Sequence, residues 1–186
     1  MEAFEQFVAL AMEAEGLLVD GPHKFGEKKQ TKKQATVEFQ TISYEVDLIG
    51  MRQDRLVLAT VKSFFGSTGV KQTEVMARGK AGSTGYKIIN DRKVRDFVIR
   101  AAAEKYGYET DQVELRLYAG KFMSKKGEQE LRVWAAEQLV GRGPIGIFNV
   151  KEVFDSVRKL HSTTYRDNPV LMSLKVLEAA GVLDLK

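Results

Sequence analysis

The chain has 186 residues, of which 44% are hydrophobic, and its formal net charge is +4. It contains no cysteine and two histidines, which excludes disulfides and thiolate metal sites and disfavours a histidine-rich zinc site, so any metal would be held mainly by oxygen ligands. No apolar run approaches the roughly 20 residues that span a bilayer, and the N-terminal MEAFEQFVAL lacks the basic start of a signal peptide, so we expect a cytoplasmic protein with no membrane partner.

Hydrophobic periodicity predicts an alternation of helices and strands. Residues 2–15 have apolar side chains at helical spacing, and Gly16 is placed to end that helix. A lysine-rich loop follows. In the segment 55–65, Leu56, Leu58 and the residues around them are nearly all apolar, which is typical of a central strand that is covered on both faces. The predicted order is a helix over 2–15, strands over 35–43, 44–51 and 55–65, a helix over 91–106, a strand over 111–122 and a helix over 127–140.

The remaining residues, from 143 to the end, predict two further helices, over 150–161 and 168–181. They form either a helical lid on the core or a small winged-helix-like tail, and we favour the lid. The expected organisation is a core over 1–122 and a helical C-terminal extension over 123–186 packed on it. Three strands, a crossover helix and one more strand imply an α/β fold whose mixed sheet has helices on both faces.

Two basic segments indicate a polyanionic partner, although either alone is equally explained as a solvated loop. Because they flank the same predicted hairpin, phosphate contacts are the favoured interpretation. A short helix is also expected near residue 74, in KQTEVMARG. The candidate nucleic-acid-binding residues are Lys28, Lys29, Lys32 and Lys33 in the first segment and Lys71, Arg78, Lys80 and Lys87 in the second.

The hairpin YEVDLIGMRQDRLVLATVKSF places acidic residues and a lysine within reach of one another. Glu45 and Asp47 share one face of their strand, and Lys62 lies near the end of the next. A turn at Gln53-Asp54 brings Asp47 opposite residue 60 or 61, so Asp47 and Lys62 can approach a common ion. Phosphodiester cleavage needs acidic oxygens that hold a divalent ion and a cation that stabilises charge at phosphorus.

The combination of EVDLI, a short turn and an apolar strand ending in VKS resembles the PD-(D/E)xK nuclease superfamily, which includes Holliday-junction resolvases and many restriction endonucleases. That resemblance covers roughly residues 1–120. It implies a restriction-endonuclease-like αβββαβ core and magnesium- or manganese-dependent hydrolysis of DNA. Asp47 matches the metal-binding aspartate, Lys62 the catalytic lysine, Glu5 the glutamate of the first helix and Glu45 the residue two before the aspartate.

Thr60 departs from the pattern, because the superfamily usually has Asp, Glu or Gln there as a second metal ligand. A hydroxyl is a poor ligand for a hard dication. Some restriction enzymes of the superfamily supply the acid from the following helix instead. Glu74, twelve residues beyond Lys62, is our candidate for that ligand.

Three functional interpretations follow. The leading one is a magnesium-dependent deoxyribonuclease in which Asp47, Glu5 and Glu74 hold the ion and Lys62 assists. The second is a catalytically inactive nucleic-acid-binding module on the same fold, which Thr60 favours. The third is a small interaction protein whose basic loops are merely soluble surface. Many members of the superfamily act as dimers, so a homodimer is one expected assembly.

Overall fold

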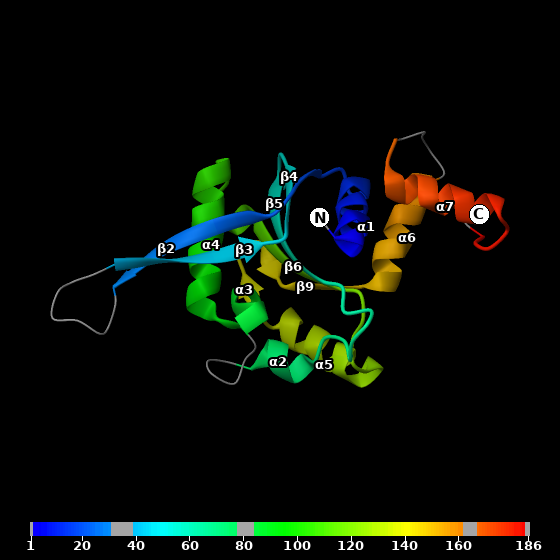
Figure 1. The fold of residues 1–186 in the computed structure, drawn as a ribbon. Helices are drawn as coiled ribbons and strands as arrows, with labels where there is room; N and C mark the ends of the chain where they lie inside the picture. The colour runs from blue at the N-terminus through cyan, green and yellow to red at the C-terminus, as the bar shows by residue number, and fades with distance from the viewer. Residues whose placement is uncertain (1, 31–38, 78–83, 162–166, 185–186) are drawn as a thin grey trace.

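A five-stranded mixed sheet between two groups of helices forms the centre of the protein (Figure 1). The computed structural model describes residues 2–30, 39–77, 84–161 and 167–184. The helices are α1 (Ala3–Ala14), α2 (Gln72–Met76), α3 (Lys87–Asn90), α4 (Arg92–Tyr106), α5 (Lys125–Ala136), α6 (Val150–His161) and α7 (Pro169–Ala179), with short 3-10 turns η2 (Thr84–Tyr86) and η3 (Thr110–Gln112). The strands are β1 (Leu18–Asp20), β2 (His23–Gln30), β3 (Phe39–Val46), β4 (Leu48–Arg52), β5 (Arg55–Lys62), β6 (Val113–Ala119), β7 (Leu139–Val140), β8 (Gly143–Pro144) and β9 (Gly146–Asn149).

The sheet has the strand order β1-β4-β5-β6-β9. The pairs β1–β4 and β4–β5 are antiparallel, whereas β5–β6 and β6–β9 are parallel. Parallel neighbours require a crossover connection, and the helices between β5 and β6 supply it. The α/β class and the mixed sheet flanked by helices are therefore confirmed.

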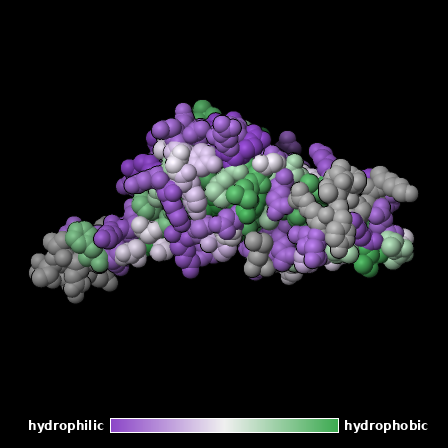
Figure 2. All heavy atoms as spheres, turned by 90° about the horizontal axis from the view of Figure 1, so that it is seen from above, coloured by the Kyte–Doolittle hydropathy of each residue, from purple (hydrophilic) through white to green (hydrophobic). Residues whose placement is uncertain are grey.

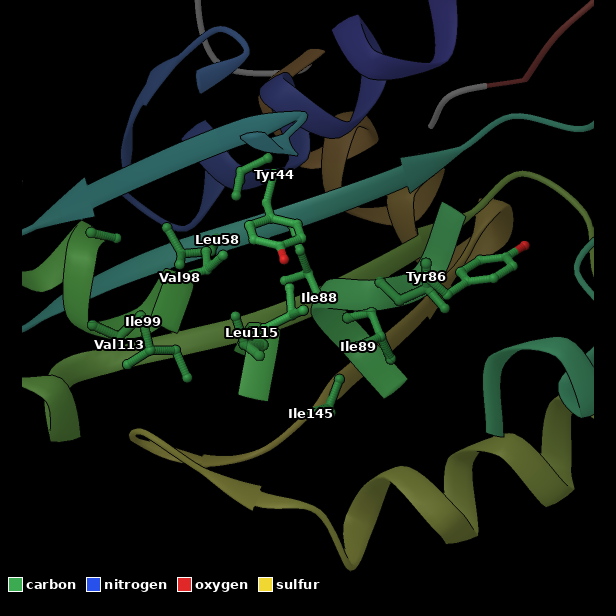
Figure 3. Close-up of a cluster of buried hydrophobic side chains, with 14 of the residues drawn as sticks. Tyr44, Leu58, Tyr86, Ile88, Ile89, Val98, Ile99, Val113, Leu115 and Ile145 are labelled. Carbon is green, nitrogen blue, oxygen red and sulfur yellow. The ribbon is translucent and has the colours of Figure 1, made fainter. Parts of the chain in front are cut away.

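Strand β5 is central because it is apolar on both faces. Leu56 and Leu58 belong to a core that also contains side chains of α4 and α5, whereas Val57, Ala59 and Val61 belong to a second core with α1 and α6. Figure 3 shows the first core, where Leu58 and Leu115 of the sheet meet Ile88, Ile89 and Val98 of the covering helices. The prediction of a strand covered on both faces is confirmed.

The expected basic loop is instead a strand. Residues 23–30 form β2, which pairs antiparallel with β3 in a two-stranded ribbon that extends from the body of the molecule (Figures 1 and 2). Phe25 is the one buried residue of β2 and the others are polar or glycine, so the segment lacks the apolar run that would have identified it.

The two strands predicted over 35–43 and 44–51 are also different in the structure. Residues 39–46 and 48–52 form one chain path that bends at Asp47, leaving the ribbon as β3 and entering the sheet as β4. Residues 35–38 lie outside the described part. The turn at Gln53-Asp54 is confirmed, since β4 ends at Arg52 and β5 begins at Arg55.

The helix ends agree with the sequence signals. The Asp91 side chain accepts hydrogen bonds from the backbone N–H groups of Lys93 and Val94, which caps α4. Gly107 follows α4 with φ of +74°, the left-handed conformation that glycine adopts without strain. Asn168 caps α7 in the same way, and α1 and α2 occur where they were expected.

The C-terminal third contains three strands that the sequence analysis did not predict. The helix predicted over 127–140 ends at Ala136, and β7 and β8 then pair with each other as a short antiparallel ribbon. Residues 146–149, expected to lead into a helix, form β9 and pair with β6 at the edge of the sheet. Helix α6 then packs on α1 and α7 packs on α6, with Val157 and Leu171 in the same core as Val8. The predicted extension thus contributes to the sheet and, through α5 and α6, to the covering layers on both of its faces.

Candidate functional site

Strand register brings Asp47, Thr60 and Lys62 together at the end of β5. Leu48 pairs with Ala59, so the residue before Leu48 lies next to Thr60. Because side chains alternate along a strand, positions 60 and 62 of β5 point to the same face. The result is a carboxylate, a hydroxyl and an ammonium group at one place, where β3 leaves the sheet.

The Asp47 carboxylate has two partners. Its Oδ2 accepts a hydrogen bond of 2.6 Å from the backbone N–H of Val61, and the same oxygen lies 3.8 Å from Nζ of Lys62. The first contact gives the Val61 N–H of β5 an acceptor at the point where the neighbouring chain bends from β4 into β3. At the same bend, the Asp47 N–H donates to the Ala59 carbonyl at 3.1 Å. The second is an ion pair beyond hydrogen-bonding distance, so Lys62 neutralises the carboxylate without being hydrogen-bonded to it.

These groups line a cavity of about 320 Å³. One wall is β3, with Ser43 and Glu45. The opposite wall is the start of α3, with Lys87 and Ile88. Its complete lining is Ile42, Ser43, Tyr44, Glu45, Asp47, Thr60, Lys62, Gly85, Lys87 and Ile88. The cavity therefore combines two carboxylates, two ammonium groups and two aliphatic hydroxyls.

Burial raises the pKa of the Asp47 carboxyl above its usual value. The positive charge of Lys62 and the hydrogen bond from Val61 oppose that effect, whereas the negative charges of Glu5 and Glu45 add to it. The net effect of burial and of these charges is to favour the protonated form of Asp47.

The other two acidic candidates lie near Asp47 but have partners of their own. Glu45 is 3.2 Å from Lys24 across the ribbon, in an exposed ion pair. Glu5 forms a capping box at the start of α1, where its Oε2 accepts from the Glu2 N–H at 2.8 Å. The ion pair of Glu45 with Lys24 is of the exposed kind that contributes about 0–1 kcal/mol, whereas the Glu5 contact is part of the cap of α1.

Glu74 lies elsewhere. Its carboxylate is 3.2 Å from Lys71 on the same turn. Burial, with a smaller contribution from the Glu74 charge, raises the pKa of Tyr86 to about 12. Within the described part of the chain, Glu74 is not one of the residues that line the cavity. The structure thus lines one cavity with Glu45, Asp47 and Lys62. Glu5 and Glu74 are not among the residues that line it, although the charge of Glu5 acts on Asp47.

The basic candidates are divided among three places. Lys87 lines the cavity, Lys28 and Lys29 lie on β2 of the ribbon, and Lys71 begins α2. Lys29 contacts Glu27 at 2.8 Å and the Tyr44 hydroxyl at 3.1 Å. The remaining four candidates, Lys32, Lys33, Arg78 and Lys80, lie outside the described residues.

Any site for a hard dication at this place would have to be built from the carboxylates of Asp47, Glu45 and Glu5. In the described residues no three histidine or acidic side chains converge closely enough to hold an ion as they stand. Glu5 and Glu45 would have to turn from their exposed partners to complete the set. Both are carboxylates, the ligand class that magnesium and manganese prefer.

Sequence reasoning missed one polar residue of the site, Ser43. Its position had a recoverable signal, because Ser43, Glu45 and Asp47 are spaced two apart and so belong to one side of an extended segment. That signal was lost because the predicted boundary between two strands fell after residue 43.

No family model and no curated protein matches this chain. Among solved structures, the crystal structure of a protein of unknown function, AF1548, is similar. Its sequence is 13% identical, the alignment covers 96% of this chain and 78% of that one, and the TM-score is 0.38. A likeness this weak carries no argument about fold or function. In the described residues no helix is long and apolar enough to cross a membrane.

Proposed function

We propose that this protein is a divalent-cation-dependent nuclease that hydrolyses phosphodiester bonds in DNA. The observation that carries the proposal is the pairing of a buried carboxylate with an ammonium group, Asp47 Oδ2 and Lys62 Nζ at 3.8 Å, in a cavity of about 320 Å³. A phosphate group fits a site of that size and charge. The resemblance of EVDLI and VKS to the PD-(D/E)xK pattern supports the same chemistry.

Asp47 would hold magnesium or manganese, with Glu45 and Glu5 as further ligands. When bound, the ion supplies Lewis-acid polarisation of the scissile phosphate. Lys62 places a positive charge next to the same phosphate and stabilises the negative charge that develops on its oxygens. Lys87, on the opposite wall of the cavity, is placed to hold the flanking phosphate.

The absence of an acid at position 60 is the weakest point of the ligand set. The Thr60 side chain is 6% exposed and lies in the same lining as Asp47. Its hydroxyl is a neutral oxygen, so we expect moderate affinity for the ion rather than the tight binding of a three-carboxylate site.

The test measures manganese binding by calorimetry and cleavage of end-labelled oligonucleotides on the same preparations. Wild type is expected to bind manganese and to cleave, whereas Asp47→Asn loses both. Lys62→Met is expected to lower the cleavage rate by about a hundredfold or more while leaving manganese binding intact. The matched control is Lys126→Met on α5, whose side chain is 87% exposed. Cleavage by Lys62→Met at the control's rate would refute the assignment.

The second candidate is a nucleic-acid-binding module without catalysis on the same fold. Thr60 favours it, as does the engagement of Glu5 in the capping box of α1. This candidate predicts no manganese binding together with a DNA affinity that falls steeply with salt. Manganese affinity that disappears in Asp47→Asn would exclude it. A homodimeric assembly and a cytoplasmic location stay predictions.

A further inference from the structure

The loop between β5 and α2 exposes two neighbouring aromatic rings directly after Lys62. Phe64 is 38% exposed and Phe65 is 57% exposed. Single exposed apolar side chains are ordinary on protein surfaces. Two aromatic rings in succession, beginning two residues beyond a candidate catalytic lysine, are a more specific feature.

The backbone at Phe64 is strained. Its φ is +47°, and among the described residues it is the one non-glycine residue with a positive φ. A bulky side chain in the left-handed region is unfavourable and persists only when the surrounding structure enforces it, which occurs most often at functional sites. Glycine at this position would relieve the strain, so the aromatic side chain is retained against a local conformational cost.

Hydrogen bonds hold the loop firmly against the end of β6. The Gly120 N–H donates to the Lys62 carbonyl at 2.8 Å, and the Val70 N–H donates to the Lys121 carbonyl at 2.9 Å. Nζ of Lys121 also donates to the Ser67 carbonyl at 2.9 Å. Gly120 itself lies so close to the loop that a Cβ there would collide with the Ser63 carbonyl oxygen and the Phe65 ring. The two rings are therefore exposed on a loop whose backbone is held in place.

The same loop contacts the start of α1, where Glu5 lies. The Phe65 ring meets the Phe4 ring edge-on, with centroids 5.4 Å apart. Oγ of Ser63 donates to a carboxylate oxygen of Glu2 at 3.3 Å. The aromatic pair thus borders the candidate site from the side of α1, whereas the cavity lies on the side of α3.

We propose that Phe64 and Phe65 form a stacking platform for unpaired nucleobases, so that the preferred ligand is single-stranded or gapped nucleic acid rather than intact duplex. Exposed aromatic faces bind bases by stacking without sequence preference. A duplex keeps its base faces inside the helix and offers none unless a base is flipped out. Lys62, just before the loop, and Lys121, on the segment after β6 that holds the loop, supply positive charge for the phosphates of the same strand. This inference rests on the proposed function in taking the ligand to be nucleic acid.

The test is a binding titration in EDTA, so that no cleavage is needed. The probes are oligonucleotides carrying 2-aminopurine, whose fluorescence falls when the base stacks, as a single strand and as the matched duplex. Wild type is expected to quench the single strand and to bind it more tightly than the duplex. Phe64→Ala and Phe65→Ala are each expected to weaken single-strand binding by about tenfold, with little effect on duplex binding.

Matched variants separate stacking from loss of fold. Phe65→Leu keeps apolar contact with Phe4 but removes the aromatic face, so it is expected to unfold like wild type and bind like Phe65→Ala. Phe65→Tyr is expected to restore binding. Leu139→Ala, at a leucine 79% exposed on β7, is the control for loss of an exposed apolar side chain. Wild-type affinity in both alanine variants, or an equal loss for single strand and duplex, would overturn the platform.

The outcomes also separate this inference from the proposed hydrolysis. Stacking of the single strand without cleavage in manganese would support the platform and refute the nuclease. Cleavage that is unchanged in both alanine variants, with no quenching by wild type, would refute the platform and support the nuclease.

Discussion

Replacement of Asp47 by alanine and by asparagine should have opposite effects on stability, because the carboxylate has two separable roles. Its Oδ2 accepts the Val61 N–H at 2.6 Å, at a junction where β3 no longer supplies a backbone carbonyl. Alanine removes that acceptor and leaves a buried donor unpaired. Asparagine keeps an acceptor oxygen of the same reach and removes only the charge.

The magnitude follows from the burial of the site. An unsatisfied buried donor costs about 1–3 kcal/mol, which for a protein of this size lowers the melting temperature by about 2–10 °C. Asp47→Ala should show that loss. Asp47→Asn should unfold at or above the wild-type temperature at pH 7, because burial raises the pKa of Asp47 and so makes its charged form unfavourable. In Asp47→Asn, Lys62 loses its ion-pair partner, but its side chain is 23% exposed and stays hydrated. The energetic cost of losing that partner is therefore small.

The assay is thermal unfolding followed by circular dichroism, with manganese binding measured on the same samples. Both variants should lose manganese binding, although only alanine loses stability. If asparagine destabilises the protein as much as alanine does, then the charge of Asp47, and not its hydrogen bond to Val61, holds the junction together.

Three further predictions concern pH, the missing ligand and the second helix layer. The pKa of Asp47 is raised in the folded protein, so the folded protein keeps a proton there at pH values where the unfolded chain has already released it. The free energy of unfolding of wild type should therefore fall relative to that of Asp47→Asn as pH rises from the ordinary carboxyl range through the raised pKa. Urea titrations at a series of pH values measure this difference, and a change in the opposite direction would contradict the prediction. Thr60→Glu should tighten manganese binding by about tenfold. It should also lower the melting temperature in EDTA but not in manganese, and Thr60→Gln is the neutral control. Equal manganese affinities of the two variants in calorimetry would count against a metal at this place. Glu15→Gln should lower the free energy of unfolding by about 1–2 kcal/mol, because it weakens two hydrogen bonds, 2.7 and 2.9 Å long, that the buried Arg116 donates to this carboxylate, which is one-third exposed. The control is Glu104→Gln, at an exposed position. Equal urea midpoints for the two variants would show that the Glu15–Arg116 pair does not hold α1 to the sheet.

The elements that the sequence predicted well are those with local signals. Helix α4 has a capping aspartate, an apolar stripe and a left-handed glycine, and it lies within the range predicted for it, 91–106. Strand β5 has an apolar run over 56–59, and its partner β4 is connected to it by a two-residue turn. Such signals act within a few residues, so they need no knowledge of the rest of the fold.

The misread elements depend on distant partners. β2 is polar and lysine-rich, and it is a strand because it pairs with β3 along its whole length. β9 has only four residues and exists because β6 offers a parallel neighbour. Neither pairing leaves a periodic pattern in the strand's own sequence, so local periodicity assigns both segments to other structure.

In the candidate site too, the features that depend on local sequence were predictable and those that depend on distant packing were not. The proximity of Asp47 and Lys62 was predictable, since a short turn and side-chain alternation fix the register between them. The position of Glu74 was not, because it depends on how α2 packs, and α2 lies against α5 rather than over the cavity. The exposed pair Phe64 and Phe65 had a visible signal, two aromatics before a glycine, but its meaning required the backbone conformation.

The bend at Asp47 separates two parts of the chain that respond differently to a change in length. Adding or deleting a residue at the far end of the ribbon, near Gln30 or Phe39, leaves the pairing of Leu48 with Ala59 untouched. One extra residue between Val46 and Leu48 would instead turn the carboxylate to the opposite side of the sheet. The ribbon is therefore a place where an engineer can graft a new tip, while the short passage from 46 to 48 tolerates no such editing.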